Sequence, residues 1–280
     1  MKFEGRIPAE NVNVTPTHPL QELVLLLSGL AALVVVLVLA VALAVDHLVP
    51  LLPPDLEVRW FGGGLRDEIP ADPRVAQVQA VLDRVASHWP GNPYAFKAAI
   101  LEEASPNALA FPGGWIFVTR GLLEQTESEN ELALVLGHEI GHYAGRDHLR
   151  GLGRGVALAL VFGALGAGES TAAAGLAGLA GDLTNRGFDR DQEAEADAFG
   201  LALMQAEYGH VAGATDFFRK LPEHGGVMGE LAGYLSTHPV SADRIEDLEA
   251  LAREKGWQLE GALAPFVVAV PERSCAEVDD

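Results

Sequence analysis

Residues 132–142 read LALVLGHEIGH, and this stretch decides how the rest of the chain is interpreted. Ser128 followed by Glu131 has the spacing of a capping box, so a helix is predicted to begin here and to run into the histidines. On a helix each residue advances about 100°, so His138 and His142 lie about 40° apart on one face and can direct both imidazoles at one ion. The preceding apolar residues favour a core helix over a surface helix that carries two histidines by chance.

Glu139 follows the first histidine and completes a His-Glu-x-x-His motif. In this motif the two histidines bind zinc, and the glutamate acts as general base on a water activated by the metal. The sequence therefore predicts a catalytic metal site with Glu139 as its base.

A catalytic zinc site needs a third protein ligand and an open position for water. The chain contains one cysteine, Cys275, which excludes a thiolate cluster and an intramolecular disulfide and leaves His, Asp or Glu as the third ligand. The best candidate is Glu193, in the stretch RDQEAEAD at residues 190–197. Asp197 lies one turn later on the same face, where it can accept a hydrogen bond from a zinc-bound histidine. Such an acidic stretch alone is more typical of a solvated helix face, and the upstream motif is what favours a metal site.

The composition excludes some other classes of protein. The chain has 280 residues and a formal net charge of −20, with no basic run that would bind phosphates, so a nucleic-acid partner is not expected. Its hydrophobic fraction of 49% is high enough to form a core, which excludes a disordered chain.

Residues 23–45 form an uncharged, mostly aliphatic run after an N-terminal tail at residues 1–22. As a helix this run would be roughly 34 Å long, enough to cross a hydrocarbon core of about 30 Å, so it predicts one transmembrane helix in contact with a lipid bilayer. A cleaved signal peptide is the alternative, because Ala42-Leu43-Ala44 offers a small-x-small cleavage site. The run is longer than a signal-peptide apolar region of about 7–15 residues, which favours the anchor.

Residues 46–71 are predicted to form a linker, stiffened by Pro50, Pro53 and Pro54. Positive charges flank the apolar run equally, but acidic residues precede Arg59, the first positive charge after it. We therefore expect a single-pass cell-membrane protein with a cytoplasmic N-terminus and an extracytoplasmic, periplasmic catalytic domain.

Residues 72–255 are predicted to form the catalytic domain, of the α+β class and mainly helical, followed by a C-terminal tail at residues 256–280. Extended patterns near residues 94–100 and 108–119 indicate a small antiparallel sheet, and Pro112-Gly113-Gly114 suggests that the second run is a bulged edge strand. The stretch Leu109–Val118 is placed to pair with an extended substrate by strand addition.

For two features after the motif, an ordinary structural role is favoured over a functional one. Residues 151–181 are rich in Gly and Ala, and their longest uncharged run, 155–168, has 14 residues, too few to cross a bilayer. Close packing over the site is favoured for this segment, and a lid is the alternative. His148 lies about 240° round the helix from His142, so a capping or buried hydrogen-bonding role is favoured over binding the same ion.

Three motifs in order give the chain a family resemblance: HEIGH at 138–142, ExxxD at 193–197, and Ser-Thr-His-Pro at 236–239 followed by Arg244. With these motifs the chain resembles the membrane-associated zinc metallopeptidases that include HtpX, the CAAX prenyl protease and the Oma-type quality-control proteases. The resemblance covers roughly residues 72–255. One spanning segment departs from the multi-pass members and favours the single-anchor or soluble branch over the processing of prenylated proteins.

The resemblance implies a zincin-like fold and a site with assigned roles. His138, His142 and Glu193 would bind one Zn²⁺ per chain. Glu139 would be the catalytic base, and Asp197 would orient a ligand histidine. The resemblance also implies that His238 and Arg244 lie close to the metal, where they would stabilise the oxyanion or anchor the substrate.

The function predicted from the sequence is therefore that of a membrane-anchored zinc endopeptidase. Its substrates would be unfolded or misassembled proteins or peptides, in protein quality control. A chaperone-like or scaffold protein that binds through the metal-site groove is one alternative, although a pure binder has no need for Glu139. A non-proteolytic metal hydrolase is another. The sequence leaves the physiological substrate and the oligomeric state open.

Overall fold

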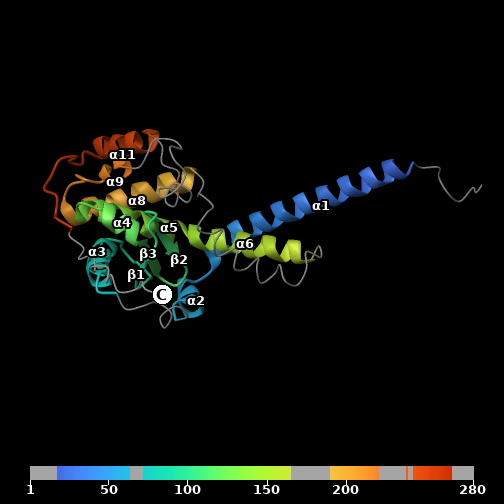
Figure 1. The fold of residues 1–280 in the computed structure, drawn as a ribbon, viewed down its shortest axis with the longest axis horizontal. Helices are drawn as coiled ribbons and strands as arrows, with labels where there is room; N and C mark the ends of the chain where they lie inside the picture. The colour runs from blue at the N-terminus through green and yellow to red at the C-terminus, as the bar shows by residue number, and fades with distance from the viewer. Residues whose placement is uncertain (1–17, 64–71, 165–189, 221–237, 239–241, 267–280) are drawn as a thin grey trace, which may run out of the picture.

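The computed structural model describes residues 18–63, 72–164, 190–220, 238 and 242–266. Figure 1 shows a mainly helical domain with a small sheet, from which one long helix projects. The elements are α1 (Pro19–Leu48), the 3-10 helix η1 (Val49–Leu51), α2 (Pro54–Phe61), α3 (Val75–Ser87), β1 (Lys97–Leu101), β2 (Ala108–Phe111), β3 (Trp115–Thr119), α4 (Arg120–Gln125), α5 (Glu129–Gly145), α6 (Asp147–Ala164), α8 (Arg190–Tyr208), α9 (Asp216–Lys220) and α11 (Ala242–Lys255). The predicted fold class, a mainly helical α+β domain preceded by a long apolar helix, is confirmed.

The sheet differs from the predicted antiparallel one, because it is mixed. In the described part of the chain the strand order is β1-β3-β2, with β1 parallel and β2 antiparallel to β3. The run at 108–119 forms two strands rather than one bulged edge strand, because Gly113 and Gly114 adopt positive φ angles of 93° and 88° and reverse the chain between them. β3 is thus central, and β2 is an edge strand beside α5.

Helices α5 and α8 pack backbone against backbone and form the centre of the domain (Figure 1). A methyl group built on Gly141 would lie 2.6 Å from Cα of Ala196, and one on Gly200 would lie 2.7 Å from the backbone nitrogen of His138. Larger side chains at these two glycines would force the helices apart. Small residues therefore bring the His-Glu-x-x-His helix and the ExxxD helix into direct contact.

The ends of α5 are fixed by local interactions. Ser128 is the N-cap, and its Oγ accepts a hydrogen bond of 3.2 Å from the backbone N–H of Glu131, so the predicted helix start is confirmed. Every residue from Asn130 to Tyr143 is buried, as the apolar sequence before the motif predicts. The helix ends at Arg146, a left-handed residue with φ 60° that turns the chain into α6.

Helix α1 is the one helix among the described residues that is long and apolar enough to cross a bilayer, and none of its side chains is buried. The segment 46–71, predicted as a linker, contains η1 and α2 in its described part. On α2, Glu57 is fully buried and accepts hydrogen bonds from the Tyr94 hydroxyl (2.8 Å) and the Gly113 N–H (3.0 Å). Helix α2 is therefore packed onto the domain.

Candidate metal centre

His138 and His142 occupy successive turns of α5 and are fully buried. Their Nε2 atoms are 3.0 Å apart. Both imidazoles are therefore directed at one point in the core, as the four-residue spacing predicts.

Glu193 on α8 brings a carboxylate to the same point. Its Oε1 lies 3.5 Å from Nε2 of His142, and its Oε2 lies 3.6 Å from Nε2 of His138. Ligand atoms at 2.0–2.2 Å from a tetrahedral zinc are about 3.3–3.6 Å from one another. The two distances from Glu193 lie in this range, and the Nε2–Nε2 distance of 3.0 Å is slightly shorter, so these three side chains surround a space close to that of one zinc ion.

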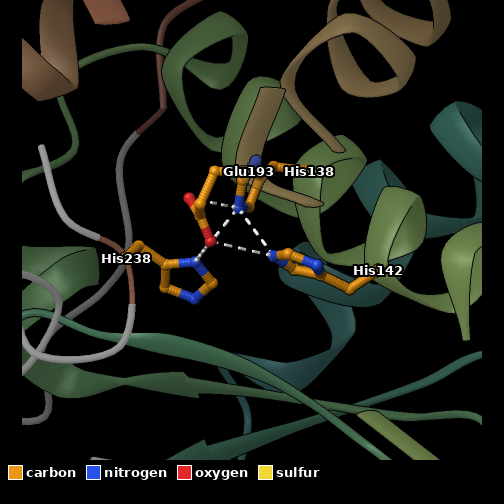
Figure 2. A group of neighbouring side chains, drawn as sticks. All are labelled: His138, His142, Glu193 and His238. Atoms are coloured by element: carbon orange, nitrogen blue, oxygen red, sulfur yellow. Dashed lines mark hydrogen bonds and ion pairs between the residues drawn. The ribbon is translucent and has the colours of Figure 1, made fainter. Parts of the chain in front are cut away.

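His238 joins the three residues to form a buried His/His/Glu/His group whose ligand atoms all lie within 4.8 Å of one another (Figure 2). Its Nδ1 is 2.9 Å from Oε1 of Glu193 and 3.1 Å from Nε2 of His138. The motif resemblance led us to expect His238 near the metal, and it lies among the potential ligands themselves. A metal bound by all four side chains would have no free tetrahedral position.

A carboxylate lies at Nδ1 of each of the two α5 histidines, on the side of the ring away from Nε2. Oδ1 of Asp197 lies 2.8 Å from Nδ1 of His138, and Oδ2 of Asp147 lies 3.0 Å from Nδ1 of His142. An Nδ1–H that donates to a carboxylate leaves the Nε2 lone pair facing the metal position. Asp147 was not among the residues predicted from the sequence, because it follows the helix break at Arg146 and no motif includes it.

Arg244, on α11, lies against the carboxylates of α8. Its Nε and Nη2 donate to Oδ2 and Oδ1 of Asp197 at 2.6 and 2.8 Å, and its Nη1 forms an ion pair of 2.8 Å with Oε2 of Glu193. The guanidinium also lies 4.8 Å from the centre of the Phe218 ring. All seven site residues named from the sequence therefore lie in one buried cluster, and Arg244 faces two of its carboxylates.

The electrostatics of the cluster favour a cation. Burial alone would lower the pKa of His142, but the carboxylates of Asp147, Glu193 and Glu139 outweigh it and raise this pKa to about 9. Burial alone would raise the pKa of Asp197, but the charge of Arg244 and the hydrogen bond with His138 lower it to about 2. Burial alone would also raise the pKa of Glu193, but hydrogen bonds with His142 and His238 lower it, so the two carboxylates of α8 stay ionised at neutral pH and stabilise positive charge where the imidazoles meet.

Glu139 is the fully buried carboxylate of the cluster that makes no hydrogen bond to any described residue. The nearest charged partner of its Oε1 is Nε2 of His238, at 3.5 Å. A buried carboxylate without partners costs free energy, so an additional polar species is expected beside it. A metal ion and its water fit this position, because Glu139 lies next to both ligand histidines on α5.

Two closely packed helices that converge on one metal position assign this chain to the metallopeptidases built on a His-Glu-x-x-His helix. The sequence model of peptidase family M48 matches residues 72–252. The chain belongs to this family, whose zinc peptidases typically have a metal-binding His/His/Glu/His cluster.

Three relatives illustrate the similarity. The chain is 31% identical over 183 residues to the mitochondrial metalloendopeptidase OMA1 of Schizosaccharomyces pombe, covering 63% of this chain and 52% of that protein. It is 33% identical over 170 residues to a putative beta-barrel assembly-enhancing protease of Vibrio cholerae, covering 57% and 35%. It is 28% identical over 184 residues to the metalloprotease LoiP of Escherichia coli, covering 64% and 71%. The chain thus spans about half or less of the length of the first two relatives.

Proposed function

We propose that this chain is a membrane-anchored zinc endopeptidase that cuts unfolded or misassembled proteins. One observation carries the proposal: Glu139, buried and without a hydrogen-bond partner among the described residues, lies beside two imidazoles and a carboxylate whose separations fit one zinc ion. A carboxylate in this position can move a proton during hydrolysis, whereas a protein that only binds has no need for it.

In this proposal one zinc ion per chain is held by His138, His142 and Glu193. Nitrogen and oxygen donors without a thiolate suit a catalytic zinc. When bound, the ion supplies a Lewis acid that lowers the pKa of a water and polarises a carbonyl oxygen. Asp197 keeps the proton on Nδ1 of His138, and Arg244 acts as a positioning residue for the two α8 carboxylates.

Glu139 takes a proton from the water that attacks the peptide carbonyl carbon. The carbon–nitrogen bond then breaks, and Glu139 passes that proton to the leaving amine, which regenerates the carboxylate. His238 lies on the Glu139 side of the cluster, with Nε2 3.5 Å from Oε1 of Glu139. We assign it the role of hydrogen-bond donor to the substrate oxygen that gains negative charge.

The proposed substrate is an extended chain segment that pairs with the edge strand β2. Among the described residues β2 is bonded to β3 on one side, and it packs beside α5, which carries the metal ligands. Strand addition recognises the backbone more than the side chains, so it suits unfolded or misassembled proteins of varied sequence. The relatives named as OMA1 and beta-barrel assembly-enhancing proteases are compatible with a role in quality control.

The proposed anchor is α1, with the N-terminus in the cytoplasm and the catalytic domain outside it. Helix α1 has no buried side chain, and its exposed leucines and valines need an apolar environment. Positive charges flank the apolar run equally, and the orientation is inferred from Asp46 and Asp55, which precede Arg59, the first positive charge after the run.

A chaperone-like or scaffold function is the second candidate, and one observation favours it. His238 lies where a fourth ligand would bind, and a zinc site closed by four protein ligands is typical of structural sites. For hydrolysis, His238 must leave this position to a water or to the substrate.

The experiment that separates the two candidates uses the full-length chain and its Glu139→Gln variant. Zinc content is measured by atomic absorption, and cleavage of denatured casein is followed by gel. The peptidase proposal expects equal zinc in both proteins and cleavage about 10²–10⁴-fold slower in the variant, the range that a general base contributes. Equal zinc with equal cleavage, or with none in the wild type, would contradict it. Cleavage of one folded partner alone would contradict the broad specificity.

A further inference from the structure

Helix α6 runs back along the last turns of α1 (Figure 1). Gly153 of α6 lies against Val45, since a methyl group built on it would be 2.9 Å from Cγ1 of that valine. One residue further on, Nη2 of Arg154 lies 2.6 Å from Oδ1 of Asp46. Because α6 begins beside residues 49–52 and reaches residue 45 by Gly153, the two helices are antiparallel.

The base of this helix pair is fixed to the catalytic domain. Arg146 donates from Nη1 to the carbonyl oxygens of Val49, at 3.0 Å, and of Leu52. The buried His148, the next residue but one, lies with Nε2 2.9 Å from Oε1 of Glu57 on α2, which confirms the hydrogen-bonding role predicted for it. The exit of α1 is therefore clamped between α2 and the start of α6 rather than joined by a free linker.

The geometry determines how far α6 extends beside the apolar helix. With Gly153 opposite Val45 and a rise of 1.5 Å per residue, Ala164 reaches the level of about residue 34, about 16 Å along α1. This is about half of a hydrocarbon core of about 30 Å. Residues 155–164 read GVALALVFGA and carry no charge, so their composition matches the part of α1 beside them.

Two partly exposed arginines lie where this pairing begins, and an exposed tryptophan lies on the neighbouring helix in sequence, α2. Arg150 and Arg154 lie on the first turns of α6 with side chains 28% and 40% exposed, and Trp60 on α2 is 63% exposed. Arginine and tryptophan at the ends of apolar helices are typical of the membrane–water interface. Arg150 pairs with Asp147 and Arg154 pairs with Asp46, so both charges are also balanced within the protein at this junction.

We propose that the uncharged end of α6, residues 155–164, enters the bilayer beside α1 to the depth of one leaflet without crossing it. The inference rests on the proposed anchoring by α1. It places the end of α5 next to the bilayer surface, and the proposed partner of α6 is phospholipid hydrocarbon. A second copy of the chain is the competing occupant.

The test uses the full-length chain with Cys275→Ser and single nitroxide labels, reconstituted in phosphatidylcholine vesicles. Labels are placed on α6 through Leu158→Cys, Leu160→Cys and Val161→Cys. Leu37→Cys on α1 is the lipid control, and Ser87→Cys, exposed on α3, is the aqueous control. The ratio of collision rates with oxygen and with a water-soluble nickel chelate reports whether each label lies in lipid.

The inference expects the α6 labels to give a ratio close to that of Leu37→Cys and several-fold above that of Ser87→Cys. A collision ratio typical of water at the α6 labels, with a ratio typical of lipid at position 37, would overturn the inference about α6 and leave the proposed anchor intact. Aqueous values at position 37 as well would overturn both. Labels shielded from oxygen and nickel alike would overturn it in favour of a second copy. Casein cleavage by the same vesicles reports on the peptidase independently.

Discussion

The two histidines of the metal centre are supported by different parts of the molecule. His138 is supported through Asp197 of α8, which Arg244 of α11 holds in turn. His142 is supported through Asp147, the first residue of α6, whose other oxygen accepts a hydrogen bond of 2.6 Å from Gln192. The first half of the site depends on the packing of α5 against α8 and α11, and the second depends on the turn between α5 and α6 together with Gln192 of α8.

Of the two histidines, His142 is the one linked by contacts to the junction between α1 and the catalytic domain. Nδ1 of His148 lies 3.3 Å from the backbone oxygen of His142, and its Nε2 contacts Glu57 on α2. The junction with α1 is therefore in contact with the end of the metal-binding helix at His142, whereas His138 is surrounded by α8 and α11. Four predictions test this division.

The largest expected effect is the loss of the metal itself. His138→Ala and His142→Ala each remove one of three ligands, so zinc affinity should fall by more than the 10–100-fold typical of a residue behind a ligand. Zinc content after dialysis measures this, with His88→Ala as the control because His88 is partly exposed and contacts Glu207 outside the cluster. One zinc per chain in either variant would show that the substituted histidine is not a metal ligand.

The next largest effect is a loss in the free energy of unfolding and concerns Arg244, which holds the carboxylate that supports His138. Arg244→Met leaves the buried carboxylates of Asp197 and Glu193 without their guanidinium, and breaking a buried pair in this way costs about 3–5 kcal/mol. Urea denaturation with a chelator present measures the free energy of unfolding. Arg253→Met is the matched control: its side chain is 58% exposed and pairs with Glu249, so a loss below about 1 kcal/mol is expected. Equal losses in both variants would show that Arg244 has no special role.

A matched pair of substitutions compares the two halves directly. Asp147→Asn and Asp197→Asn each disturb the hydrogen bond that orients one ligand histidine, and each is expected to weaken zinc binding about 10–100-fold. Competition with a fluorescent chelator measures the affinity. Wild-type affinity in Asp147→Asn, with a loss in Asp197→Asn, would show that His142 is oriented by something other than Asp147.

The smallest effect concerns the junction and depends on pH. Burial alone would raise the pKa of Glu57, but hydrogen bonds from His148, Gly113 and Tyr94 lower it below its ordinary value of 4.5. Its stabilising contribution is therefore complete above about pH 4.5 and is lost as the pH falls through the lower folded-state pKa. Glu57→Gln should remove about 1–2 kcal/mol near neutral pH and make stability less sensitive to acid. An unchanged acid dependence would contradict this account.

The site residues that repeat at helical spacing could be predicted from the sequence. The four-residue spacings of His138/His142 and Glu193/Asp197 define one face of each helix, and Gly141 and Gly200 allow these faces to meet. Periodicity could not reveal Asp147, because it reaches His142 only through the left-handed Arg146, a residue type that gives no turn signal.

Long-range pairing was equally hidden in the sequence. Alternating patterns locate the strands, but the parallel pairing of β1 with β3 passes over β2 and depends on the packing of the helices rather than on any local residue. The position of α6 beside α1 depends on Gly153 and Arg154, which contact residues about a hundred positions earlier. Close packing over the site, with a lid as the alternative, is predicted for residues 151–181, of which 165–181 lie outside the described residues.

X-ray absorption at the zinc edge of the full-length protein measures whether His138, His142 and Glu193 bind one zinc ion. We expect one zinc per chain, with nitrogen and oxygen ligands at about 2.0–2.2 Å, at least two imidazoles and no sulfur. Loss of one imidazole in His238→Ala would identify the fourth ligand. A sulfur ligand at about 2.3 Å, or a protein that binds no zinc, would contradict this expectation.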